Sequence, residues 1–269
     1  MREVVIASAA RTPIGKFGSA LKDVSAAELG RVVAQASMKR AGIAPQDVDE
    51  VIIGHARQAG NGPNLARQIG FHADVPVDRP AYTINKACAS GLKAITLACQ
   101  SIVTGENDVV IAGGVEQMSQ IPYLLMKARW GYRLGSDEVV DAMHRDGYYC
   151  PLAEMMMGRT AEVLVEEYGI SREAQDRFAL ESHRKAVRAW EEGLFDAEVV
   201  PVEAPGHKGK TVLEEDERPR SDTSMEKLAR LRPVFKEGGT ITAGNASGIN
   251  DGAAATVVMA AERAAAWGI

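Results

Sequence analysis

Short apolar runs alternate with longer segments whose apolar residues recur at helical spacing. A short apolar run bounded by turn residues is typical of a buried strand, whereas recurrence every three to four residues predicts a helix that packs on one side. The clearest helix covers residues 25–41, where Ser25 can cap the start and Gly42 can close the end. Buried strands are predicted at residues 4–8, 51–53, 81–85 and 108–112, and further helices at 65–71 and from residue 89 onward. This alternation implies βαβ crossovers and therefore an α/β fold with a layered core.

The pattern changes from about Ser119. Aromatic, Met and Arg residues fill residues 123–149 without a clean period, and residues 206–220 are charged and read as an exposed loop or hairpin. Helices are predicted at residues 154–168, 171–192, 224–231 and 261–267, and strands at 198–203 and 253–260. The apolar face of helix 171–192 is predicted to contain Ala174, Phe178, Ala179, Ala186, Val187 and Trp190. We therefore predict a core at residues 1–118, an inserted subdomain at 119–247 and a return to the core at 248–269.

The candidate for chemistry is Cys88, in the segment Asn85-x-x-Cys88-Ala-Ser-Gly91 between the strand at 81–85 and the following helix. A sulfur near a helix N-terminus lies where unpaired N–H groups and the helix dipole stabilise a thiolate. The small residues after Cys88 allow another backbone or a ligand to approach closely. Most free cysteines, however, are small buried apolar residues. Position alone leaves both interpretations of Cys88 open.

The other motifs carry little information when taken singly. Gly113-Gly114-Val115-Glu116 follows a predicted strand and is either a tight turn near a ligand or a loop, of which the loop is favoured. It is not the GxGxxG pattern of dinucleotide sites. Asn250-Asp251-Gly252 is interpreted as a turn before a strand. The histidines lack metal-ligand spacing and are interpreted as surface or packing residues: His55, His72, His144, His183 and His207.

Composition narrows the class of protein. The 269 residues are 46% hydrophobic and 25% charged, with a formal net charge of −5, which argues against a nucleic-acid partner. No apolar run is expected to reach the roughly 18–20 residues that span a bilayer, and the N-terminus does not resemble a signal peptide. The three cysteines, Cys88, Cys99 and Cys150, show neither disulfide nor metal-site spacing. We expect a reduced cytoplasmic protein with no metal and no membrane partner.

Taken together and in order, the motifs resemble the thiolase family of acetyl-CoA C-acyltransferases. They are Arg11-Thr-Pro-Ile-Gly15, Asn64-x-Ala-Arg-Gln68, Asn85-x-x-Cys88-Ala-Ser-Gly91, Gly113-Gly-Val-Glu-Gln-Met-Ser119, Met157-Gly-Arg-Thr-Ala-Glu162, Leu228-Ala-Arg-Leu-Arg-Pro-Val-Phe235 and Thr242-Ala-Gly-Asn-Ala-Ser-Gly-Ile-Asn-Asp-Gly-Ala253. The resemblance covers essentially the whole chain. It implies a thiolase-like layered βαβαβ core with an inserted α+β loop domain that binds coenzyme A.

The resemblance also implies site residues. The family's acylated nucleophile falls on Cys88, and its coenzyme A contacts fall on Met157, Arg220, Phe235, Ala243 and Ser247. Coenzyme A is expected as a co-substrate, with no permanently bound cofactor. The sequence differs from the family pattern at Leu65 (usually Pro), Met156 (often His) and Lys227 (often Ser), so it does not define the acyl-chain length.

The family completes its site with a C-terminal half. That half supplies an Asn-Glu-Ala-Phe segment, a Gly-His-Pro histidine that activates the nucleophile, and a second cysteine as acid/base. None of them occurs here, where Cys150 is the last cysteine and His207 the last histidine. The sequence is therefore interpreted as an N-terminal half, expected to form a homo-oligomer or to pair with a partner chain that carries the other half.

The implied reaction is thiolysis of a 3-ketoacyl-CoA, or condensation of two acetyl-CoA to acetoacetyl-CoA, through an acyl-cysteine intermediate. The alternative is a non-catalytic subunit that binds coenzyme A or acts as a scaffold. β-Ketoacyl synthases also use a cysteine on this fold, but Gly244-Asn-Ala-Ser-Gly248 and Met157-Gly158 favour a thiolase.

Overall fold

The computed structural model describes residues 1–206 and 209–269, so His207 and Lys208 of the predicted loop lie outside the described residues. The chain divides into two compact units. The core unit contains Met1–Gln120, Asp196–Glu217 and Asn250–Ile269, and the second unit contains Ile121–Phe195 and Arg218–Ile249.

The sequence predicts that Asp196–Glu217 belongs to the inserted subdomain. In the structure this segment belongs to the core unit, which corrects the predicted boundary. Backbone hydrogen bonds attach this segment to the first strand: Arg11 N–H donates to the Glu198 carbonyl at 2.9 Å, and Val200 N–H donates to the Arg11 carbonyl at 2.8 Å. Val202 and Ala204 are each 1% exposed and pack in the core cluster. The predicted strand at 198–203 lies later in the chain, at β10 (Val202–Gly206), which pairs with β11 (Gly209–Leu213) as a hairpin.

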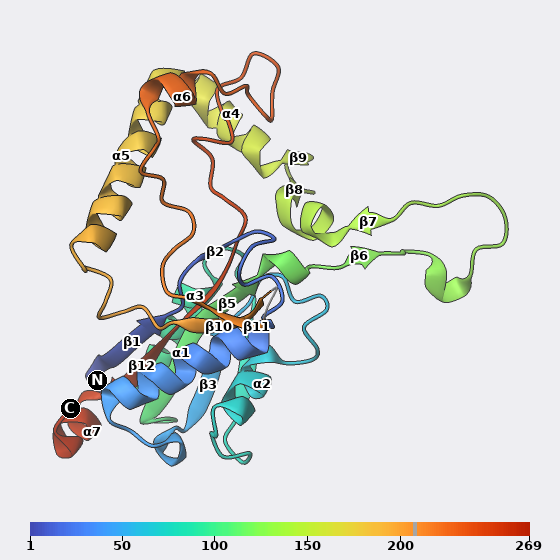
Figure 1. Cartoon of the computed structure of the whole chain (residues 1–269). Coiled ribbons are helices and arrows are strands. Elements are labelled where there is room, and N and C mark those ends of the chain that lie inside the picture. The colour runs from blue at the N-terminus through green and yellow to red at the C-terminus, as the bar shows by residue number, and fades with distance from the viewer. Residues whose placement is uncertain (207–208) are drawn as a thin grey trace. The chain divides into compact units, whose positions relative to one another are not determined.

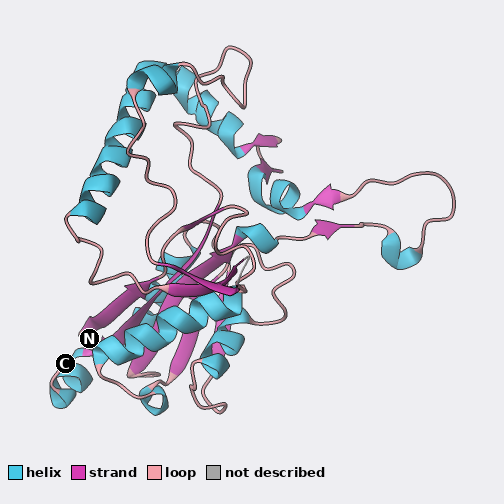
Figure 2. Cartoon of the chain, in the orientation of Figure 1, coloured by secondary structure: helices cyan, strands magenta, loops and turns pink. Residues whose placement is uncertain are grey.

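The core unit is built on one six-stranded mixed sheet (Figures 1 and 2). Five strands follow the order β1 (Val4–Arg11), β12 (Asn250–Ala260), β5 (Val109–Gln117), β3 (Glu50–Gly54) and β4 (Ala81–Ile84), and β2 (Gly15–Lys16) pairs with β12. Strand β3 runs parallel to both β4 and β5, whereas β12 is antiparallel to β1, β2 and β5. The α/β fold class predicted from the alternating pattern is confirmed.

Helices cover both faces of this sheet. Helices α1 (Ala26–Ala41) and α2 (Leu65–His72) pack with Val109 and Ile111 of β5, whereas α3 (Ser90–Thr104) packs with the alternate residues, Val110 and Ala112. Each of these four strand residues is at most 1% exposed. A strand buried on both faces shows a continuous apolar run rather than strict alternation, which explains the apolar run at 108–112. Fully burying a valine or isoleucine side chain stabilises the fold by about 1.5–3 kcal/mol.

Sequence signals define the helix ends in the core unit. The Ser25 hydroxyl accepts the Glu28 N–H at 3.2 Å at the start of α1, and Gly42 closes the helix with φ of 69°. Gly268 closes α7 (Ala261–Trp267) in the same left-handed conformation, with φ of 73°. Glycine adopts this region without the steric penalty that a Cβ brings, and the predicted caps at Ser25 and Gly42 are confirmed.

The glycine pair Gly113-Gly114 does not end its strand, which corrects the loop interpretation. Strand β5 continues through both residues to Gln117. A Cβ on Gly113 would overlap the Ala254 carbonyl oxygen of the neighbouring strand, and a Cβ on Gly114 would lie 3.0 Å from the Gly91 Cα of α3. The pair is therefore required by close backbone approach on both sides of the strand, not by a turn.

Asn250-Asp251-Gly252 is likewise strand and not turn, because β12 begins at Asn250. The Asp251 side chain is fully buried and accepts hydrogen bonds from the N–H, at 2.9 Å, and the hydroxyl of Ser119. Burial, aided by the nearby charge of Glu217, raises the pKa of this carboxyl despite those donors.

The second unit contains more helix than strand. Its helices are α4 (Met157–Tyr168), α5 (Arg172–Glu191) and α6 (Met225–Ala229), and its short strand pairs are β6 (Tyr123–Leu124) with β7 (Val140–Asp141) and β8 (Tyr149–Cys150) with β9 (Met155–Met156). A single turn of 3₁₀ helix at Ala128–Trp130 and a π-helical turn at His144–Tyr148 also belong to this unit, whereas the 3₁₀ turns at Pro45–Asp47 and Met118–Gln120 belong to the core unit.

Two details of this unit differ from the predictions. Helix α4 begins at Met157 rather than at residue 154, because Met155–Met156 pairs with β8. On α5 the predicted apolar face is rotated: Phe178 is 77% exposed, while the buried side chains are Asp176 and Leu180. The buried aspartate takes part in a polar network that a count of apolar residues does not reveal.

Among the residues that the structure describes, one helical segment, Ala87–Thr104, is long and apolar enough to cross a membrane, by length and composition only. The expectation that no run reaches that length is wrong for this segment. Only 22% of it is buried: Ala94, Ala98 and Ile102 pack on the sheet, whereas Leu92 is 68% exposed. Within the described residues of the core unit, helix α3 therefore has one packed face and one exposed face.

Candidate functional site

Cys88 lies in the loop between β4 and α3 and is exposed, whereas Cys99 and Cys150 are both partly buried. The interpretation of Cys88 as a small buried apolar residue is therefore wrong. The residue before it, Ala87, has φ of 48°, and Ala89 forms the N-cap of α3 without a side-chain hydrogen bond. An exposed cysteine two residues before a helix start is in the position at which backbone N–H groups favour an anion.

Ser90 closes the loop around the cysteine. Its hydroxyl accepts the Lys86 N–H at 2.8 Å and donates to the Ala87 carbonyl at 2.6 Å. Because these bonds join the residues before the cysteine to the first turn of α3, they fix Cys88 relative to the helix.

The start of α3 lies against Gly54, the last residue of β3, and against Gly114 of β5. A Cβ on Gly54 would overlap the Ser90 carbonyl carbon, and Gly114 and Gly91 approach each other with no side chain between them. The prediction that the small residues after Cys88 allow close backbone approach is confirmed for Gly91. This packing fixes the cysteine loop against the edge of the sheet.

Four of the five predicted coenzyme A residues are exposed in the second unit: Met157, Arg220, Ala243 and Ser247. The fifth, Phe235, is partly buried, and its ring lies so close to Gly158 that a Cβ there would overlap it. Met157 is the first residue of α4, so Phe235 packs beside the first turn of the helix that begins with the exposed Met157.

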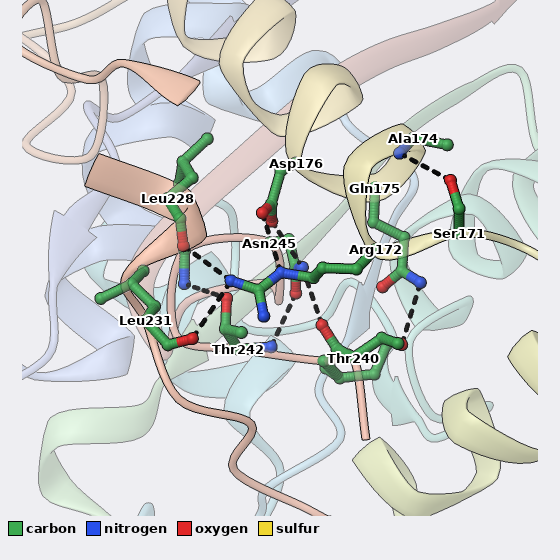
Figure 3. A network of polar contacts seen from close by, with 12 residues as sticks. Ser171, Arg172, Ala174, Gln175, Asp176, Leu228, Leu231, Thr240, Thr242 and Asn245 are labelled. Carbon is green, nitrogen blue, oxygen red and sulfur yellow. Dashed lines mark hydrogen bonds and ion pairs between the residues drawn. The ribbon is translucent and has the colours of Figure 1, made fainter. Parts of the chain in front are cut away.

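The turn that carries Ala243 is held by a polar network (Figure 3). The Asn245 side chain accepts the Thr242 N–H at 2.7 Å and donates to Asp176 at 2.9 Å and to the Thr240 carbonyl at 3.1 Å. Asp176 in turn accepts the Arg172 guanidinium at 2.8 Å. The guanidinium also donates to two carbonyls at the end of α6, Leu228 at 2.6 Å and Leu231 at 3.1 Å.

Glu162 anchors the same turn from α4. Its side chain is 2% exposed and accepts the N–H groups of Thr240 and Ile241, both at 2.8 Å. Burial opposes ionisation, but the N–H groups of Ile241 and Thr240 outweigh it, so the pKa of Glu162 lies below its usual value. A Cβ on Gly239 would overlap the carboxylate, which explains the glycine there.

Sequence reasoning missed Asp176, Asn245 and Glu162 as supporting residues. Glu162 and Asn245 lie within quoted motifs, Met157-Gly-Arg-Thr-Ala-Glu162 and Gly244-Asn-Ala-Ser-Gly248, so they could have been singled out. Asp176 could not, because a charged residue on an amphipathic helix normally faces solvent.

Arg220 belongs to an exposed cationic cluster. Its guanidinium lies 3.4 Å from the Asp222 carboxylate, which Lys227 also contacts at 2.8 Å. Hydrogen bonds from Lys227 and Arg220 lower the pKa of Asp222 to about 2. His183 Nδ1 accepts the backbone N–H of Arg220 at 3.3 Å. Burial together with the positive charge of Arg220 lowers the pKa of this histidine. Two cations share one carboxylate, which leaves a net positive surface suited to a phosphate.

Two other features lie outside this set of residues. A surface groove of about 440 Å³ follows α5, and its lining includes Phe178, Lys185 and Phe195 but none of the predicted site residues. Over the described part of the chain, no group of three His, Cys, Asp or Glu side chains is arranged to hold a metal ion.

Comparison with known proteins identifies the family. The family model described as "Thiolase, N-terminal domain" matches residues 4–262. The chain belongs to the thiolase family. The "Probable acetyl-CoA acyltransferase" of Staphylococcus aureus (strain MSSA476) is 54% identical over 265 residues, which cover 98% of this chain and 67% of that protein.

Two solved thiolase structures have the same fold as this chain. The Bacillus anthracis acetyl-CoA acetyltransferase superposes with a TM-score of 0.97 at 46% identity, covering 100% of this chain and 68% of its own. The acetyl-CoA acetyltransferase from Syntrophomonas wolfei gives 0.96 at 46% identity, with 67% of its chain covered. The thiolase fold that the sequence motifs implied is confirmed.

Proposed function

We propose that this thiolase chain is an acyltransferase that acts on acyl-CoA thioesters, with Cys88 as the nucleophile. The observation that carries the proposal is the exposed Cys88 at the start of α3 in a chain of this family. The printed names of its relatives, acetyl-CoA acyltransferase and acetyl-CoA acetyltransferase, support the same reaction class.

The proposed reaction has two steps. The Cys88 thiolate attacks the keto carbon of a 3-ketoacyl-CoA, and the bond between C2 and C3 breaks. Its electron pair goes to C2, which takes up a proton and leaves as acetyl-CoA, while the acyl group remains as a thioester on Cys88. The thiol of a second coenzyme A then attacks this thioester, and an acyl-CoA leaves as the cysteine is regenerated. The reverse sequence condenses two acetyl-CoA to acetoacetyl-CoA.

Coenzyme A is proposed to bind to the second unit as a co-substrate. Arg220, supported by Lys227, presents positive charge to a phosphate, and Met157 and Phe235 offer apolar surface to the pantetheine arm. Ala243 lies on the turn that Asn245 and Glu162 hold in place, Ser247 follows that turn, and both residues are exposed.

The test is mass spectrometry after incubation with acetyl-CoA. The proposal expects one acetyl group, located by peptide mapping on Cys88 and absent from Cys88→Ser. Cys99→Ser is the matched control, because Cys99 lies on α3, the helix that follows Cys88, and its replacement should leave the adduct unchanged. Binding of coenzyme A without any adduct would instead support a non-catalytic coenzyme A-binding subunit.

A further inference from the structure

The loop before Cys88 is tied to the sheet through a chain of side-chain and backbone hydrogen bonds. The chain begins at Glu116 near the end of β5. Its carboxylate accepts the N–H groups of Ala56, at 3.1 Å, and Arg57, at 2.9 Å, in the turn that follows β3. His55 Nδ1 lies 3.2 Å from the same carboxylate and 2.8 Å from the Val115 carbonyl.

These contacts indicate which nitrogen of His55 carries the ring hydrogen and favour the ionised form of Glu116. Since His55 Nδ1 faces two oxygens, it carries the ring hydrogen, and the buried Nε2 has no hydrogen-bond partner among the described residues. Burial opposes ionisation of Glu116, but the His55 ring and the N–H groups of Arg57 and Ala56 outweigh it, so its pKa is lowered. Glu116 is therefore an anion that clamps the turn after β3.

Asn85 continues the chain toward the nucleophile. Its side-chain amide donates to the Ala56 carbonyl at 3.1 Å, and its side-chain oxygen accepts the Ala87 N–H at 2.9 Å. One amide thus joins the clamped turn to the residue that directly precedes Cys88.

Ala87 is the strained member of the chain. Its φ of 48° is in the left-handed region, which a residue with a Cβ adopts only when its surroundings enforce it. The Asn85 side chain holds its N–H and the Ser90 hydroxyl holds its carbonyl, at 2.6 Å. The direction in which the backbone enters Cys88 depends on this conformation.

We propose that Asn85, clamped through Ala56 by Glu116, is a positioning residue that keeps Ala87 in the left-handed conformation and so presents the Cys88 thiol at the start of α3. The proposal rests on the proposed function, because it assumes that Cys88 is the nucleophile. It gives a physical reason for the spacing Asn85-x-x-Cys88 and for the glutamate in Gly113-Gly-Val-Glu116.

The experiment compares Asn85→Ala with Asn64→Ala. Asn64 is a matched control because its side chain also bridges two backbone segments, donating to the Ala81 carbonyl at 2.8 Å and accepting the Arg67 N–H at 3.2 Å, without contact to Ala87. Alkylation of Cys88 by iodoacetamide and its acetylation by acetyl-CoA are timed by mass spectrometry across pH. We expect Asn85→Ala to slow both by about tenfold, as a misplaced reacting group does, while Asn64→Ala leaves both rates unchanged.

Ala87→Gly provides the rescue. Glycine adopts positive φ without a steric penalty, so adding Ala87→Gly to Asn85→Ala should restore part of the lost rate. A purely structural role for Asn85 would instead lower the melting temperature without this recovery.

The outcomes separate two failures. If Cys88 of the unaltered chain is never acetylated, the proposed function fails. If Cys88 is acetylated and Asn85→Ala reacts as fast as the unaltered chain, the positioning role is overturned. If Asn85→Ala does not fold, Glu116→Gln is tested instead, because it keeps the shape of the side chain but weakens its hold on the turn after β3. Slower alkylation and acetylation of Cys88 in this variant would support the positioning role of Asn85, and unchanged rates would overturn it.

Discussion

At the scale of single residues, carboxylates in similar positions behave differently. Glu162 and Asp251 are both at most 2% exposed, and both accept backbone N–H groups. The donors around Glu162 outweigh the burial and lower its pKa, whereas burial prevails at Asp251 and raises the pKa. The two groups should therefore give opposite dependences of stability on pH.

Glu162 tests how stability depends on pH when the pKa of a buried carboxyl is lowered. Its lowered pKa contributes stability that is present above the unfolded pKa and is lost as the pH falls through the folded value. Glu162→Gln should destabilise the fold by about 1–2 kcal/mol near neutral pH, and the difference should shrink below about pH 4. Urea titrations measure it. Glu166→Gln is the control, because Glu166 is 56% exposed one helical turn later and its ion pair with Lys236 contributes little.

Asp251 tests how stability depends on pH when the pKa of a buried carboxyl is raised. A raised pKa contributes stability that is fully present at low pH and is lost as the pH rises through the folded value. Asp251→Asn cannot ionise, so relative to the unaltered chain it should gain stability as the pH is raised from about 3 to about 7. A constant difference across that range in the same titrations would contradict this assignment.

Arg220 tests the proposed coenzyme A site. If its guanidinium meets the ribose phosphate, Arg220→Ala should weaken binding of coenzyme A about tenfold but change binding of dephospho-coenzyme A much less. Isothermal titration with both ligands measures this, and Arg230→Ala removes another exposed arginine as the control. Equal losses for both ligands would place the guanidinium elsewhere on the nucleotide.

At the scale of elements, local signals predicted some features and long-range packing decided others. The caps at Ser25, Gly42 and Gly268 follow from residues adjacent in sequence, and the sequence motifs led to the thiolase fold. The glycines of β5 were misread because the atoms that require them, near Ala254 and Gly91, are distant in sequence. The sequence alone does not distinguish a glycine that a turn requires from one that close packing requires, because the packing neighbours are distant in sequence.

The crowding at α3 leads to a stability prediction. Gly54→Ala would drive a Cβ into the Ser90 backbone, which cannot move without shifting the start of the helix. We expect a loss of about 3 kcal/mol and slower alkylation of Cys88. Gly91→Ala is the control, because its Cβ would meet Gly114 at an ordinary 3.6 Å, and it should be neutral or stabilise the helix by up to about 1 kcal/mol. Equal effects of both variants would refute the close-approach argument.

At the scale of the whole molecule, the described residues leave one apolar face of α3 exposed. The segment Ala87–Thr104 is apolar, yet only 22% of it is buried, and the chain spans 67% of its Staphylococcus aureus relative. Leaving roughly 600 Å² of apolar surface in water would forgo on the order of 15 kcal/mol, an upper bound that is comparable to the stability of a domain. We propose that this face pairs with another copy or with a partner chain.

Sedimentation and activity test the pairing. We expect a dimer or larger species, little thiolysis of acetoacetyl-CoA by the chain alone, and recovery when the remaining third of the Staphylococcus aureus relative is added as a separate polypeptide. Leu92→Gln should weaken association, whereas Phe71→Gln, which removes a side chain 60% exposed on α2 at the opposite face of the sheet, should not. A compact monomer with full turnover would contradict both the expected association and the expected lack of thiolysis by the chain alone.

The central place of β12 in the sheet has a consequence for synthesis of the protein. Strand β12 lies between β1 and β5, and its register pairs Val4 with Ala260, so β1 can pair within the sheet only after residue 260 has been translated. Until β12 leaves the ribosome, β1 and β5 each present an unpaired edge, the kind of surface on which nascent chains aggregate. The core can close only after synthesis passes residue 260, so slow folding and a need for chaperone protection follow from the order of the strands.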